Sequence, residues 1–278
     1  MTLASQPSTR GREIAHLFRD SRGLLATRAC DVDAILREAE VEVTLSRRPD
    51  PGYAAVLIRL QGGGAGIMMA ADQSEGRRRF SLAHELGHFY IPSHVNAGPM
   101  LRCADADLRA RSSDSKVLEW EANDFAAELL MPRKLFGQDI RNKPINFGVV
   151  EQLAAKEMYQ VSMTAAAWRL VQLTREQCAL VMTVEGAINW VARSASFAHR
   201  IPERNQRIGS GTAAAAVFRG EAENRKAESV PPFEWLEIRE GQSLGNVELL
   251  ESTFSIPSLN QVLSLLWVSE AEEDEFDD

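Results

Sequence analysis

The stretch His84-Glu85-Leu86-Gly87-His88 is a His-Glu-x-x-His pentapeptide, and the fold of the surrounding chain follows from it. On a helix, residues four apart lie on one face, so the rings of His84 and His88 can point at one metal ion. Glu85 stands beside them, where it can take a proton from an attacking water. This spacing is the usual arrangement of zinc proteases.

The residues around the pentapeptide predict a buried helix that ends soon after it. Most of its neighbours are apolar, and Pro92 stops the helix about one turn after His88. Gly87 lowers the helix propensity by roughly 1 kcal/mol relative to alanine. We therefore expect another segment of the chain to pack closely against Gly87.

A tetrahedral catalytic zinc needs a third protein ligand and one open position. His94 lies six residues after His88, which is the metzincin spacing, but Ile91 occupies the place where that pattern has a glycine. A β-branched residue does not easily take the glycine conformation. The competing source of a ligand is a second predicted helix over residues 119–132.

This second helix carries two carboxylates that cannot both face the metal. At about 100° per residue, Glu119 and Glu121 point roughly 200° apart. Glu121 shares a face with Phe125 and Glu128 and lies nearer the apolar stripe, and Pro132 closes the helix.

The two segments 78–88 and 119–132 together resemble the ImmA/IrrE family of metallopeptidases, in order and in rough spacing, over about residues 10–135. The resemblance implies a thermolysin-like zincin domain that binds Zn²⁺ through His84, His88 and, by the family pattern, Glu121. It implies Glu85 as the catalytic base. It also implies cleavage of a regulatory protein, often a helix-turn-helix repressor.

Composition indicates a soluble globular protein. The 278 residues are 45% hydrophobic and 25% charged, with a net charge of −8 that argues against broad nucleic-acid affinity. We expect no membrane segment and no signal peptide. Three widely spaced cysteines favour a reduced, cytoplasmic setting.

The fold class expected for the whole chain is α+β, in four parts. Residues 1–140 form the metallopeptidase domain, and 141–176 a helix-turn-helix-like segment. Residues 177–268 form a small C-terminal α+β domain that begins with a hairpin around Glu185-Gly186, and 269–278 an acidic disordered tail. Strands are predicted over 53–60 and 65–70, and 93–115 is expected to be a polar connection. The stretch 77–79, three arginines, is expected to be a solvated turn, or else a contact with an acidic substrate or with the protein's own acidic tail.

The expected function is zinc-dependent endopeptidase activity, with a transcriptional repressor as the protein substrate and DNA an improbable partner. One alternative is a metal-stabilised, non-enzymatic regulator that binds a repressor or DNA. A second alternative is an antitoxin-like partner of a separately encoded toxin. The ligand types alone do not distinguish zinc from Mn²⁺ or Fe²⁺.

Overall fold

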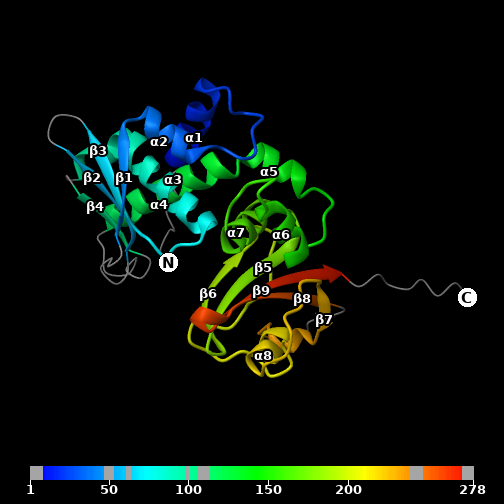
Figure 1. Ribbon diagram of the computed structural model, residues 1–278. Helices are drawn as coiled ribbons and strands as arrows, with labels where there is room; N and C mark the ends of the chain where they lie inside the picture. Colours follow the sequence, from blue (N-terminus) through cyan, green and yellow to red (C-terminus); the bar gives the residue numbers. More distant parts are fainter. Residues whose placement is uncertain are drawn as a thin grey trace, which may run out of the picture. The chain divides into compact units, whose positions relative to one another are not determined.

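The structure is a computed structural model that describes residues 9–46, 53–60, 64–97, 100–104, 113–237 and 247–270. The chain divides into two compact units (Figure 1). Unit 1 comprises Met1–Leu135 with Ala154–Ser162, and unit 2 comprises Phe136–Leu153 with Met163–Asp278. The acidic tail predicted over 269–278 lies outside the described residues after Glu270.

Unit 1 contains helices that pack beside a four-stranded sheet. Its elements are α1 (Arg10–Ser21), α2 (Val32–Glu38), β1 (Val41–Ser46), β2 (Tyr53–Arg59), β3 (Ala65–Ala70), α3 (Glu75–Tyr90), η1 (Pro92–Ala97), β4 (Met100–Ala104) and α4 (Ser113–Leu130). The strand order is β1-β3-β2-β4, in which β1 runs parallel to β3 and the other pairs are antiparallel. Helix α3 packs against β2 and α4, and α1 packs against α4 (Figure 1).

Helices α3 and α4 approach each other closely at Gly87. A Cβ atom on Gly87 would lie 3.1 Å from the Cα of Ala122 and 3.1 Å from the Cβ of Phe125. The expected close packing at Gly87 is therefore confirmed, and it places the pentapeptide beside α4.

Two arginines at the start of α3 form hydrogen bonds to other segments of unit 1. Arg79 is 5% exposed and donates to the backbone oxygens of Cys30 and Gln160, at 2.6 and 3.0 Å. Arg78 makes two hydrogen bonds to Asp33, at 2.6 and 3.1 Å. The expectation of a solvated turn is wrong for both arginines, because Arg79 is buried and Arg78 is paired with Asp33.

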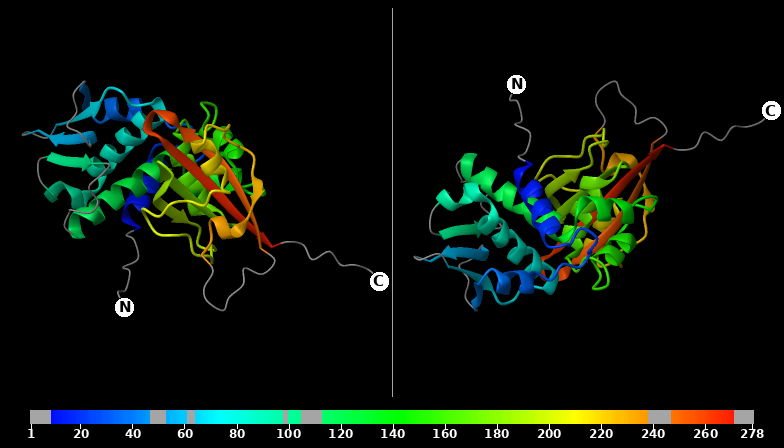
Figure 2. Two further views of the ribbon diagram at one scale, coloured as in Figure 1. Left: turned by 90° about the horizontal axis from the view of Figure 1, so that it is seen from below. Right: turned by 90° about the horizontal axis from the view of Figure 1, so that it is seen from above.

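Unit 2 is built on a five-stranded sheet with the strand order β6-β5-β9-β8-β7, and every adjacent pair is antiparallel. Its elements are α6 (Phe147–Ala154), α7 (Met163–Leu173), β5 (Gln177–Val184), β6 (Ala187–Arg193), α8 (Ala213–Phe218), β7 (Glu228–Val230), η2 (Pro232–Glu234), β8 (Val247–Ile256), η3 (Pro257–Leu259) and β9 (Gln261–Glu270), and α5 (Arg133–Asp139) leads into it. Helices α6 and α7 lie on one side of this sheet and α8 on the other (Figure 2).

The faces of the second sheet are buried by different partners. On one face, Ala214 of α8 joins a core of apolar strand residues such as Val181 and Leu249. On the other, Trp168 of α7 packs its ring 5.1 Å from that of Trp190. The predicted hairpin is confirmed, since Glu185 and Gly186 both have positive φ angles, 52° and 77°, as a type I′ turn requires.

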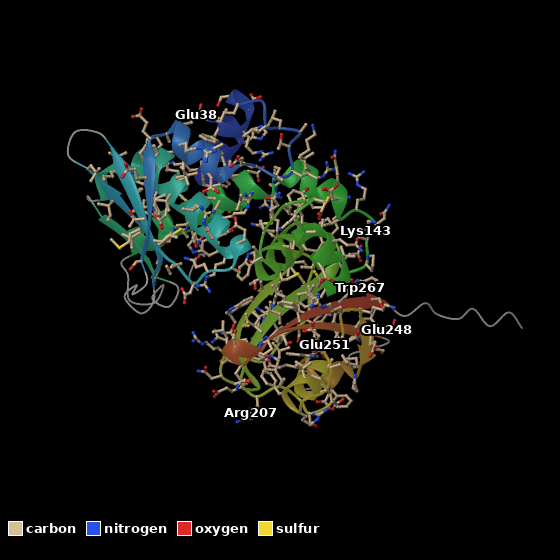
Figure 3. The ribbon with its side chains drawn as sticks, in the orientation of Figure 1. Glu38, Lys143, Arg207, Glu248, Glu251 and Trp267 are labelled. Carbon is tan, nitrogen blue, oxygen red and sulfur yellow. The ribbon has the colours of Figure 1, made fainter. Side chains whose placement is uncertain are left out.

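A buried carboxylate lies at the centre of unit 2. Glu251 on β8 (Figure 3) is fully buried. It accepts hydrogen bonds from the backbone N–H groups of Ala213 and Ala214, from the indole of Trp235 and from the hydroxyl of Ser264, at 2.8 to 3.0 Å. Burial raises the pKa of Glu251, although these hydrogen bonds oppose the shift. The carboxylate thereby ties α8, β8 and β9 together.

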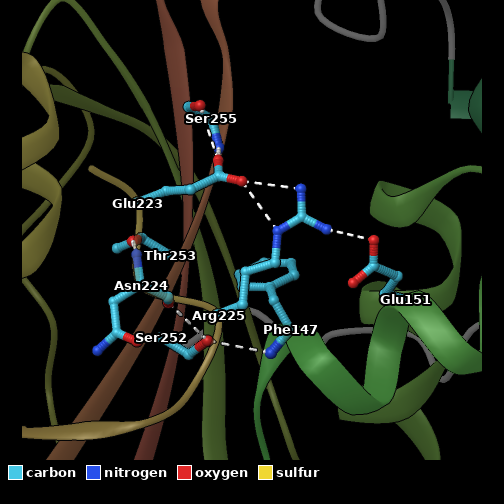
Figure 4. A network of polar contacts seen from close by, with 8 residues as sticks. All are labelled: Phe147, Glu151, Glu223, Asn224, Arg225, Ser252, Thr253 and Ser255. Atoms are coloured by element: carbon cyan, nitrogen blue, oxygen red, sulfur yellow. Dashed lines mark hydrogen bonds and ion pairs between the residues drawn. The ribbon is translucent and has the colours of Figure 1, made fainter.

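Polar contacts also attach the segment before β7 to the sheet and to α6 (Figure 4). Glu223 accepts from the backbone and the hydroxyl of Ser255, at 2.7 and 2.8 Å. Arg225 pairs with Glu223 at 2.8 Å and with Glu151 of α6 at 2.5 Å. Burial raises the pKa of Glu223, but its hydrogen bonds outweigh that effect and the net shift is downward.

Two local predictions need correction. The stretch 93–115, expected to be a polar connection, contains η1 and the strand β4. The stretch 141–176 does contain two helices, but residues 155–162 separate α6 from α7, whereas a helix-turn-helix needs a turn of about 3–4 residues. Arg169 of α7 is buried, so this basic residue is unavailable to a partner. The predicted tight turn is therefore wrong.

No helix among the described residues combines the length and apolar character needed to cross a membrane. The architecture as a whole is mixed α+β, as predicted from the sequence, with two sheets and helices around each.

Candidate metal centre

Three buried side chains from α3 and α4 converge within unit 1. His84, His88 and Glu119 each offer one ligand atom, and these atoms lie within 4.8 Å of one another. The Nε2 atoms of the two histidines are 3.1 Å apart, and the Nε2 of His84 lies 3.3 Å from the Oε2 of Glu119. The pentapeptide therefore presents both rings to α4, as its helical spacing predicts.

The packing of α3 on α4 explains why Glu119 reaches the two histidines. Glu119 precedes Ala122 by three residues and Asn123 by four, so these three side chains share one face of α4. Ala122 is the residue that meets Gly87. The absence of a side chain on Gly87 lets this face of α4 come close to α3.

Each histidine also has a contact at its second ring nitrogen. The Nδ1 of His84 lies 2.9 Å from the Oδ1 of Asn123, and the Nδ1 of His88 lies 2.9 Å from the Nδ1 of His94. A metal-binding histidine almost always uses its second nitrogen in this way, because the contact fixes the ring and its tautomer. Both Nε2 atoms are thereby left to face Glu119.

The position of Glu121 differs from the sequence-based assignment. Its Oε2 lies 3.0 Å from the Nε2 of His94, and its Oε1 lies 3.9 Å from Arg10 of α1. Glu119, not Glu121, is the glutamate in the three-residue group. The geometry therefore favours Glu119 as the third ligand, and Glu121 stands behind His94.

The geometry differs from the sequence-based choice because α4 is covered on more than one side. Helix α1 crosses α4 so closely at Gly11 that a Cβ there would lie 1.9 Å from the backbone oxygen of Glu121. Glu121 is thus as buried as its place near the apolar stripe suggested, with 2% of its surface exposed, yet it is directed away from the paired Nε2 atoms. The Asn123 that follows Glu119 by four residues is the sequence signal that would have favoured Glu119.

Glu85 is fully buried next to His84. Its negative charge is one of the causes that raise the pKa of His84. Glu85 therefore lies where the sequence places a base, on the same helix as both histidines and inside the protein.

Burial and the nearby carboxylates shift the protonation of the centre. Burial lowers the pKa of His88 to about 4, so this ring is neutral at neutral pH. Burial raises the pKa of Glu119, but hydrogen bonds to His84 and His88 outweigh this, and the net shift is well below the usual range. Burial lowers the pKa of His84, but Glu119 and Glu85 outweigh it, so positive charge is favoured there.

The donor set fits zinc. Two imidazole nitrogens and one carboxylate oxygen form a three-ligand catalytic set of the kind that leaves one position open. Tetrahedral bonds of about 2.0–2.1 Å place neighbouring ligand atoms about 3.3 Å apart. The separations of 3.1 and 3.3 Å at His84 are close to that value, and the Nε2 of His88 lies 3.9 Å from the Oε1 of Glu119.

Fold and donor set together define a mixed α+β protein with a His-Glu-x-x-His centre. Residues 38–171 match the family model of the IrrE N-terminal-like domain, Peptidase_M78. Over these residues, the resemblance to the ImmA/IrrE family that was predicted from the sequence is confirmed.

A solved structure supports the fold. A Mycobacterium tuberculosis transcriptional regulator is similar over 95% of this chain and 72% of its own, with a TM-score of 0.50 and 14% sequence identity. At this identity the likeness concerns the fold alone. No curated protein sequence matches the chain significantly.

Proposed function

We propose that this protein is a zinc-dependent endopeptidase. The observation that carries the proposal is the convergence of His84, His88 and Glu119 in the interior, with Glu85 buried on the same helix. The Peptidase_M78 family of residues 38–171 supports the same chemistry. We also propose that the domain has the thermolysin-like zincin arrangement.

In this proposal, His84, His88 and Glu119 hold the metal. Zinc, when bound, supplies a Lewis acid that polarises the scissile carbonyl and makes a water acidic enough to lose a proton near neutral pH. Glu85 accepts that proton and passes it to the leaving amine. Because Glu85 is buried, its charge is weakly screened, which strengthens its effect on a proton nearby.

The substrate proposed is a regulatory protein, with a transcriptional repressor as the first candidate, in a cytoplasmic setting. The family supports a protein substrate. The buried, free thiols of Cys30 and Cys178 agree with a reducing compartment. An extended substrate segment is expected to pair with an edge strand of the first sheet, whose outer strands are β1 and β4.

The experiment compares protein fragments generated in a lysate of the source organism. Zinc-loaded wild type is matched with Glu85→Gln, which is nearly isosteric but cannot act as a base. Glu75→Gln serves as the control, because it removes a carboxylate from the exposed start of the same helix. New N-termini are identified by mass spectrometry after amine labelling, and the zinc content of each variant is measured.

We expect new N-termini with wild type and Glu75→Gln, and a loss of about 10² to 10⁴ in their rate of appearance with Glu85→Gln at equal zinc content. Equal cleavage by Glu85→Gln would remove Glu85 as the base. Zinc-loaded wild type that generates no new N-terminus would contradict the peptidase proposal and favour a non-enzymatic regulator.

A further inference from the structure

His88, His94 and Glu121 form a continuous buried chain of hydrogen-bonding groups that leads away from the metal centre. The Nδ1 of His88 lies 2.9 Å from the Nδ1 of His94, and the Nε2 of His94 lies 3.0 Å from Glu121. His88 and His94 are each 0% exposed and Glu121 is 2% exposed. All three groups are in the interior, where an unmatched donor or acceptor is expensive.

We propose that His94 and Glu121 are positioning residues that fix the tautomer and orientation of His88. An ionised carboxylate only accepts hydrogen bonds, so Glu121 requires the proton of neutral His94 to be on Nε2. The Nδ1 of His94 is then an acceptor, which requires the proton of His88 to be on Nδ1. The lone pair of His88 is thereby left on Nε2, the atom that faces His84 and Glu119.

Other contacts fix both ends of this series of hydrogen-bonding side chains. Arg59 on β2 donates to the backbone oxygen of His88 at 2.6 Å. At the far end, the positive charge of Arg10 faces Glu121 at 3.9 Å. Ile91 ends α3, and the backbone N–H of His94 bonds to the oxygen of Ile91 at 3.0 Å, which sets the turn that brings His94 back beside His88.

This geometry gives His94 a different role from the one suggested by the metzincin spacing. His94 meets the Nδ1 side of His88, whereas His84 meets the Nε2 side. His94 therefore acts on a metal only through His88. The effect of His94 and Glu121 on zinc binding rests on the proposed metal centre. The tautomers of His88 and His94 themselves are measurable in the metal-free protein.

The first test is long-range ¹H–¹⁵N spectroscopy of the metal-free full chain, which is tractable because the sequence has five histidines. We expect a proton on Nδ1 of His88 and on Nε2 of His94. Glu121→Leu should disturb this pattern, and Glu121→Gln, whose carbonyl still accepts, should preserve it. A proton on Nε2 of His88 in wild type would overturn the inference.

The second test is zinc affinity, measured by competition with a chromophoric chelator. His94→Leu should bind zinc about 10- to 100-fold more weakly, the usual effect of losing such a partner. His94→Gln should recover most of that loss, because its amide offers one acceptor for His88 and one donor for Glu121. A merely structural role would instead affect the thermal unfolding of the metal-free variants without this rescue of affinity.

The outcomes separate the two proposals. Tight zinc binding by wild type together with unchanged affinity in His94→Leu would overturn the positioning role and leave the metal centre standing. Equal losses in His94→Leu and His94→Gln would also overturn it. A wild type that binds no zinc would contradict the metal centre itself, and therefore also the role of His94 and Glu121 in positioning His88 for zinc.

Discussion

Gly87→Ala should weaken both the fold and the metal centre, although alanine is the better helix former. The added Cβ would lie 3.1 Å from carbon atoms of Ala122 and Phe125 and 3.2 Å from the backbone oxygen of Ala122. Ordinary carbon contacts are about 3.5–4.0 Å, so α3 and α4 must separate by roughly half an ångström. Overpacking of this kind costs about 1–3 kcal/mol, against a gain in helix propensity of about 1 kcal/mol.

The separation matters more for zinc than for folding. Metal–ligand distances tolerate only about 0.2 Å, and Glu119 moves with α4 relative to both histidines. We therefore expect a net loss of about 1 kcal/mol in unfolding free energy and a loss of zinc affinity on the order of ten-fold. Urea denaturation of the metal-free protein measures the first quantity, and chelator competition measures the second.

Gly137→Ala is the matched control. Gly137 lies in α5, and a Cβ there would meet nothing within 4 Å. This variant should keep the zinc affinity of wild type and gain up to about 1 kcal/mol. The reasoning is refuted if Gly87→Ala behaves like Gly137→Ala in both measurements, because the helices would then accommodate a methyl group freely.

Two further predictions concern buried charge. Burial raises the folded-state pKa of Glu251 above 4.5, so the folded state binds more protons than the unfolded state from pH 4.5 up to that pKa. Denaturant titrations of wild type and Glu251→Gln give the difference between their unfolding free energies. The advantage of wild type over the variant should fall as pH rises through this window, and an advantage that rises with pH would contradict the upward pKa shift. Separately, Arg79→Leu should lower stability by about 1–3 kcal/mol, because two carbonyl groups lose a buried donor. Arg78→Ala should cost about 0–1 kcal/mol by the same assay, since its pair with Asp33 is partly exposed; equal effects of the two variants would be the contrary result.

Short sequence patterns were sufficient to predict the elements whose backbone conformation is set by residues within the same short stretch. The pentapeptide with Pro92 predicts α3, and Glu185-Gly186 predicts the hairpin of β5 and β6, because these residues set backbone conformation directly. β1 was not predicted. It pairs in parallel with β3, its direct neighbour in the sheet, although β2 lies between them in the sequence, and such a pairing leaves little trace in a short window of sequence.

The choice between Glu119 and Glu121 shows where periodicity stops being informative. Both residues are buried, so an apolar stripe cannot say which one faces the metal. The decision depends on which helix covers which side of α4, with α3 at Ala122 and α1 at Glu121. The helix-turn-helix-like interpretation of 141–176 failed for a similar reason. Residues 155–162 group with unit 1, where Arg79 donates to the backbone oxygen of Gln160.

The central claim is that His84, His88 and Glu119 bind the metal, and it is tested most directly by elemental analysis of two matched variants. Glu119→Gln and Glu121→Gln make the same change two residues apart on one helix. After dialysis against a chelator, wild type and Glu121→Gln should keep about one zinc per chain, and Glu119→Gln should lose it. Zinc retained by Glu119→Gln and lost by Glu121→Gln would contradict the claim and return the third ligand to Glu121.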